Sequence, residues 1–175
     1  MYRGKMISSP ETLEATSVEI FRQSAESFCT LIEEPRSEPR QGALEAFLVA
    51  LSEIYYLGLL LPQIEPSTNE WPLDDIAARE ASVRSTLSAL IGRDDVYWLV
   101  FNPQNNPPKE SVAGMLSADL SEIWGDLKGG LLTLERYGEA ALDDVHWDWR
   151  FSLKSHWGSH AVNALAALHS LVQYS

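Results

Sequence analysis

The feature that most constrains this fold is the spacing of its apolar side chains, which recur every three or four residues over most of the sequence. This spacing is the period of one face of an α-helix. Proline, which interrupts helices, occurs only in the first part of the sequence, and the last one is Pro108. The remainder is therefore free to form long helices, and the sequence predicts an all-α fold.

The apolar stripes predict a bundle of about five helices in a single domain of residues 1–175. They cover residues 13–32, 44–58, 76–91, 116–134 and 149–171. The first helix is expected to begin at Ser9 or Thr12, and Asp74 is expected to cap the third. The last stripe predicts one long C-terminal helix, packed antiparallel on the helix over 116–134.

Two segments between the stripes, 62–73 and 102–108, are rich in proline, serine and asparagine and are predicted to be loops. The run 96–101 consists of residues that favour strands. It has no evident pairing partner elsewhere in the sequence. We therefore interpret it as a buried extended connector or a short helical turn.

The charge balance excludes several classes of partner. The sequence has 25 acidic and 13 basic side chains, a net charge of −12, which repels nucleic acid and anionic membrane surfaces. No run of apolar residues reaches the roughly 20 needed to span a bilayer, and no signal peptide is evident. We expect a cytoplasmic protein whose partner is a basic protein or a second copy of the chain. The single Cys29 is interpreted as core packing.

Three carboxylates and two histidines form the most notable pattern. Asp119, Glu122 and Asp126 share one flank of the helix over 116–134, beside its apolar stripe. His156 and His160 are four residues apart and share the matching flank of the last helix. If the two helices form an antiparallel hairpin, Asp126 lies opposite His156 and Glu122 lies opposite His160.

This pattern has two interpretations. Glu122, Asp126, His156 and His160 are candidate ligands of a divalent metal, because carboxylates and histidines on facing helices build metal sites in bundles. Alternatively, the histidines pair with the carboxylates and tie the helices together. The helical motif H-E-x-x-H is absent, and the sequence favours the structural interpretation. No cofactor other than this possible metal is expected.

Tryptophan is concentrated near the C-terminus. Trp124, Trp147, Trp149 and Trp157 lie on or near the two helices just described. Core packing accounts for most of them, but tryptophan and arginine are also enriched at interaction surfaces. The residues predicted for an interaction surface are Trp147, Trp149, Arg150 and Trp157.

The same region carries a family resemblance. It consists of D-L-S-E-I-W-G-D-L-K from Asp119 to Lys128, then Gly130-Leu131, Trp149-Arg150-Phe151 and His156-Trp157-Gly158-Ser159-His160, continuing to Leu168-His169. This region, within residues 116–172, resembles the domain of unknown function 5063 family of small bacterial helical proteins. The resemblance implies a helical fold and a bacterial source, and it assigns no reaction.

Two functions follow as hypotheses. The first is a non-enzymatic interaction or accessory module, such as an inhibitor or immunity protein whose acidic surface attracts a basic enzyme. The second is a metal-dependent hydrolase with its carboxylate and histidine site between the last two helices.

Overall fold

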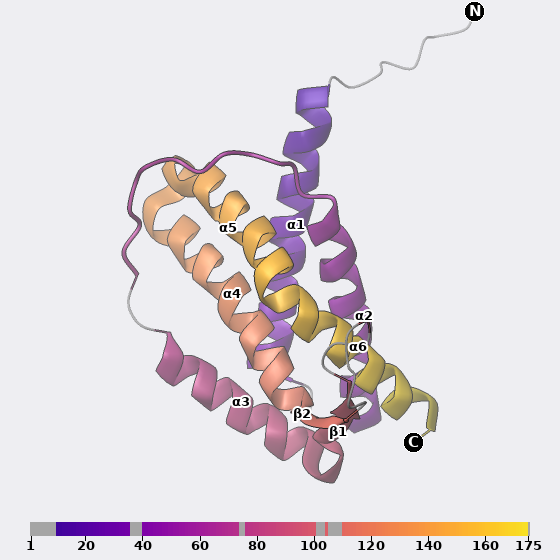
Figure 1. Ribbon diagram of the computed structural model, residues 1–175. Coiled ribbons are helices and arrows are strands. Elements are labelled where there is room, and N and C mark those ends of the chain that lie inside the picture. Colours follow the sequence, from indigo (N-terminus) through magenta and orange to yellow (C-terminus); the bar gives the residue numbers. More distant parts are fainter. Residues whose placement is uncertain (1–9, 36–39, 74–75, 101–103, 105–109, 175) are drawn as a thin grey trace, which may run out of the picture.

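The computed structural model describes residues 10–35, 40–73, 76–100, 104 and 110–174 (Figure 1). Its helices are α1 (Pro10–Glu33), α2 (Arg40–Leu59), α3 (Ala77–Ile91), α4 (Leu116–Tyr137), α5 (Leu142–Ser155) and α6 (Trp157–Tyr174). Two 3-10 turns, η1 (Gly92–Asp94) and η2 (Gly138–Ala141), follow α3 and α4. Strands β1 (Val96–Leu99) and β2 (Val112–Met115) precede α4. The predicted all-α bundle is confirmed.

Helix α4 is the centre of the arrangement and packs against α1, α3, α5 and α6. Helix α2 packs against α1 and α6 on the other side of the core. Figure 1 shows α3 lying along the outside of α4, and the segment after α2 passing over the start of α5. The largest fully buried side chains include Phe21, Phe28, Phe47, Trp124, Trp149 and Trp157.

Two of the buried indoles pack directly against glycines of neighbouring helices. A side chain at Gly130 of α4 would collide with the ring of Trp149, and one at Gly58 of α2 would come within 3.0 Å of the ring of Trp157. The Trp157 Nε1–H donates to the Trp149 carbonyl (3.2 Å), and the Trp149 Nε1–H donates to the Leu127 carbonyl (3.3 Å). The glycines therefore set how closely the helices approach.

The predicted single C-terminal helix is wrong, because the chain breaks at His156 into α5 and α6. His156 has φ −143° and ψ −87°, far from helical values. A side chain at Gly158 would overlap the Leu153 carbonyl oxygen, so glycine permits this tight junction. The apolar stripe continues across the break, which is why the spacing did not reveal it. The predicted packing on α4 is retained by α6.

The interpretation of residues 96–101 as an unpaired connector is also wrong. β1 pairs antiparallel with β2, with Val96 opposite Met115 and Leu99 opposite Val112. The partner strand, Val-Ala-Gly-Met, is short and runs directly into α4, so its own sequence carries little strand signal. The predicted cap Asp74 and loop 102–108, apart from Gln104, lie outside the described residues.

Helix α2 is the one described helix that is long and apolar enough to cross a membrane by length and composition alone. Polar residues such as Glu45 and Glu53 interrupt its apolar residues, so it contains no long uninterrupted apolar run. Leu44, Phe47, Leu51 and Ile54 of α2 are fully buried in the core. Val49, Tyr56 and Leu59 of the same helix are exposed, so packing within the bundle uses only part of its apolar surface.

The start of α4 depends on the buried carboxylate of Asp95. Its Oδ1 accepts from the Ser117 N–H (2.7 Å), and its Oδ2 accepts from the hydroxyls of Ser117 and Ser88 (both 2.8 Å). Asp95 is only 4% exposed. The carboxylate satisfies a free N–H at the helix N-terminus, where the helix dipole favours a negative charge.

We expect Asp95→Ala to lower the free energy of unfolding by about 2 to 4 kcal/mol, because the two buried donors of Ser117 and the partly buried hydroxyl of Ser88 lose their acceptor. Denaturant unfolding measures this change. Glu53→Ala, at an exposed position of α2, is the control and should change the free energy by less than about 0.5 kcal/mol. Equal effects of the two substitutions would contradict the capping role.

His146 of α5 is buried, and its Nε2 has no hydrogen-bond partner among the described residues. Burial lowers its pKa to about 4, an effect that Asp143 opposes and Arg22 reinforces. In the unfolded chain an imidazole titrates near 6.5. Between these two values the unfolded state binds more protons, so the contribution of His146 to stability falls as pH decreases.

We therefore expect wild type to lose about 2 to 3 kcal/mol more stability than His146→Leu as pH falls from about 7 to about 4. Unfolding curves of both proteins at matched pH values test this. Parallel losses of stability in the two proteins would show that His146 is not a source of the acid sensitivity.

Candidate metal centre

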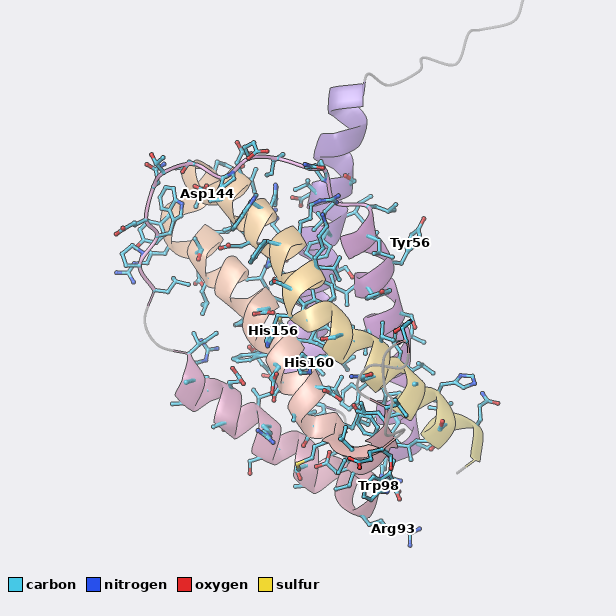
Figure 2. The ribbon with its side chains drawn as sticks, in the orientation of Figure 1. Tyr56, Arg93, Trp98, Asp144, His156 and His160 are labelled. Carbon is cyan, nitrogen blue, oxygen red and sulfur yellow. The ribbon has the colours of Figure 1, made fainter. Side chains whose placement is uncertain are left out.

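The predicted histidines and carboxylates meet on one side of the bundle. Asp119, Glu122 and Asp126 lie on one face of α4, at spacings of three and four residues. His156 is the residue at the break between α5 and α6, and His160 is in the first turn of α6. Figure 2 shows the two histidines side by side against the middle of α4.

Each imidazole is held at Nδ1 by its own aspartate. The His156 Nδ1 lies 2.7 Å from Asp126 Oδ2, and the His160 Nδ1 lies 2.8 Å from Asp119 Oδ1. A carboxylate accepts hydrogen bonds, so it favours the tautomer with hydrogen on Nδ1. In the neutral form of that tautomer, Nε2 carries a free lone pair.

Both Nε2 atoms face the same carboxylate. The Oε2 of Glu122 lies 2.9 Å from the Nε2 of His160 and 3.5 Å from the Nε2 of His156. One ligand atom from each of these three residues lies within 4.8 Å of the others, a spacing that could hold a metal ion. The centroids of the two rings are 5.0 Å apart and their planes are inclined by 69°, an edge-to-face arrangement.

Asp119 is itself held in position by a residue of strand β1. Its second carboxylate oxygen accepts a hydrogen bond from the hydroxyl of Tyr97 in β1. A side chain at Gly114, opposite Tyr97 in β2, would collide with the tyrosine ring. Burial and the Asp119 carboxylate raise the pKa of Tyr97, so its hydroxyl remains a donor. This arrangement fixes the orientation of Asp119 and, through it, the ring of His160.

A further carboxylate, that of Glu80, reaches the same region from α3. Its Oε2 lies 2.9 Å from the position that a β-carbon at Gly125 would occupy. Partial burial raises the pKa of Glu80, and the carboxylates of Glu122 and Asp126 raise it further. Gly125 thus makes room on α4 for the Glu80 side chain.

The site is rich in negative charge. Among the described residues, the ion-pair partners of Asp119, Glu122 and Asp126 are His156 and His160. The hydrogen bond to Asp119, and then the charges of the surrounding carboxylates, raise the pKa of His160 against the effect of its partial burial. His156 is exposed, while Glu122 and His160 are partly buried, so the site is open to solvent.

The structure brings all four predicted ligand residues together, but it divides them into two roles. Glu122, His156 and His160 form the central cluster, whereas Asp126 lies behind His156. Asp119 and Asp126 lie behind different histidines. The sequence did not predict Glu80 and Tyr97 as part of the site, because the spacing of residues does not show that α3 and β1 pack against α4. Gly125, a glycine inside a helix, is the sequence feature that corresponds to the approach of Glu80.

The predicted interaction surface requires a correction. Trp149 and Trp157 are fully buried in the core and do not reach the surface. Arg150 is partly buried and donates to the Leu61 carbonyl, which ties α5 to the segment after α2. Trp147 is partly exposed and stacks on Phe151 (4.8 Å between centroids, 7° between planes).

The family model for the domain of unknown function DUF5063 matches residues 13–174. This chain belongs to that family. The DUF5063 match covers nearly the whole chain and includes the C-terminal region whose motifs carry the resemblance. No curated protein matches the sequence.

A solved structure shares the fold. The crystal structure of protein BF1032 from Bacteroides fragilis superposes with a TM-score of 0.77 at 23% sequence identity. The match covers 91% of this chain and 93% of that protein. At this identity the likeness establishes a common fold and carries no information about a reaction.

Proposed function

We propose that this protein binds a divalent transition metal ion through the Nε2 atoms of His156 and His160 and the carboxylate of Glu122, and that it belongs to the metal-dependent hydrolases. The observation that carries this proposal is the pair of imidazoles, each with Nδ1 on an aspartate and Nε2 directed at Glu122. Histidine ligands of metals commonly donate their other ring N–H to a carboxylate in this way.

The donor set supports this assignment. Two histidines and one glutamate are a known ligand set of catalytic zinc, which retains a further position for water or substrate. The exposure of His156 leaves such a position accessible. Structural zinc sites, in contrast, use four protein ligands and are closed. Imidazole also suits iron, copper and nickel, so the ligand atoms favour transition metals over Mg²⁺ or Ca²⁺.

A bound metal ion would supply an activated water near neutral pH. Other residues of the protein would orient the ligands and handle the proton. Asp126 and Asp119 hold the two imidazoles in the ligating tautomer, and Tyr97 holds Asp119. Glu80 lies beside the ligand glutamate from a separate helix, where a carboxyl group can accept and return a proton.

The first test is metal binding by tag-free protein freed of metals with a chelator. Zn²⁺ at about 100 times its dissociation constant should stabilise the wild type by about 2.7 kcal/mol. Glu122→Gln and His160→Gln should abolish that stabilisation. Asp119→Ala should weaken binding by about 10- to 100-fold. Calorimetric titration and thermal unfolding measure both effects, with Mn²⁺ as a second metal.

His169→Gln is the matched control, because His169 is an exposed histidine of α6 away from the cluster; it should bind Zn²⁺ like wild type. Unchanged binding by Glu122→Gln and His160→Gln, or no binding by wild type, would reject the metal centre.

The water chemistry is tested separately on Co²⁺-loaded protein. Its visible spectrum should titrate with an apparent pKa of roughly 7, and a spectrum independent of pH would argue against an activated water.

A further inference from the structure

A groove of about 550 Å³ lies beside the metal centre, and the proposed function does not use it. It is formed by α4, by α5 and by the segment 66–73 that crosses the start of α5 (Figure 1). Gly125, which faces Glu80, and Asp126, which holds His156, both line the groove, so the groove adjoins the metal centre. Its lining residues include Trp71, Asp126, Gly129, Asp144, Trp147, Asp148 and Phe151.

The groove is negatively charged. Three aspartates line it, Asp126, Asp144 and Asp148, and no lysine, arginine or histidine is among its described lining residues. Partial burial raises the pKa of Asp148, and the neighbouring carboxylates of Asp144 and Asp126 raise it further. Ionised carboxylates this close to one another repel, and a cation bound between them would relieve that repulsion.

Asp144 has a structural role in the groove. Its carboxylate accepts from the backbone N–H of Ser67 (2.5 Å), the hydroxyl of Ser67 (2.7 Å) and the Nε1–H of Trp71 (2.7 Å). Figure 2 shows Asp144 at the end of the bundle where the segment crosses α5. These bonds fix one wall of the groove, whereas Asp148, one turn further along α5, offers its carboxylate to the open space.

Aromatic faces complete the lining. Trp147 and Phe151 stack in parallel, and Phe151 is 53% exposed. Trp71 packs against Tyr137 with centroids 5.1 Å apart. Flat aromatic rings beside carboxylates bind organic cations, since the ring face and the carboxylate both attract positive charge.

Gly129 is the observation that points to a ligand. A β-carbon at Gly129 would have no atom within 4 Å, whereas one at the next residue, Gly130, would collide with Trp149. Glycine inside a helix costs about 1 kcal/mol relative to alanine. The packing of this chain explains that cost at Gly130 but not at Gly129, where glycine leaves part of the groove lining without a side chain.

We propose that this groove binds the arginine side chain of a basic peptide or protein segment, with the guanidinium against Trp147 and the carboxylates of Asp148 and Asp126. Arginine fits better than lysine, because its planar group stacks on aromatic rings and pairs with carboxylates in a fork. This inference goes beyond the proposed function and requires no metal.

The test is calorimetric titration of metal-free protein, in chelator, with the peptide acetyl-Gly-Arg-Gly-Arg-Gly-amide. The matched peptide with glutamine in place of arginine should bind at least about tenfold more weakly. Gly129→Leu places a side chain in the groove, at a position where a β-carbon has no atom within 4 Å, and should abolish binding. Trp147→Ala and Asp148→Asn should each weaken it by about fivefold or more.

Glu53→Gln changes the net charge as Asp148→Asn does, at an exposed site outside the groove, and should bind like wild type. Glu122→Gln should also keep peptide binding, which separates this inference from the metal centre. Absence of arginine-peptide binding by wild type, equal binding by Gly129→Leu, or equal weakening by Glu53→Gln and Asp148→Asn would overturn the proposal. Trp147→Ala, which alters a partly exposed ring, serves if Gly129→Leu does not fold.

Discussion

The bundle depends on the packing of large buried indoles against glycines. Trp149 packs against Gly130 of α4, and Trp157 packs against Gly58 of α2. Each indole N–H also finds a backbone carbonyl, so neither ring leaves a buried donor unpaired. These contacts fix the distance of α5 and α6 from their neighbours. The cluster of histidines and carboxylates forms at the edge of that packing, where α4 and α6 are already held together.

The geometry of the cluster makes its two interpretations separable. A simple ion pair between helices requires one contact for each histidine, and Asp126 and Asp119 supply those contacts at Nδ1. The second contact of each ring, at Nε2, places both rings on a single glutamate. A purely structural role does not require that convergence, whereas a metal ligand set does. The carboxylates around it favour any cation that enters.

Much of the fold and part of the site follow from the sequence. The spacing of apolar residues identified the helices, and the flank argument placed Glu122 and Asp126 opposite the correct histidines. The break at His156 was not predictable from that spacing, because the apolar stripe runs through it and the steric reason lies in the contact of Gly158 with Leu153. The contributions of Tyr97 and Glu80 depend on how β1 and α3 pack against α4, which local patterns do not encode. The groove likewise depends on the path of the segment after α2.

The break between α5 and α6 also affects how such a chain can change over generations. In a continuous helix, one inserted residue turns everything beyond it by about 100°, which would move ligands and groove residues together. Here Trp147, Asp148 and Phe151 belong to α5, while His160 belongs to α6. The junction between them is His156 itself, and its tight geometry depends on glycine at position 158. A change of length at this junction would therefore move His156 away from Asp126 and Glu122, so the proposed metal centre constrains the break between the two helices.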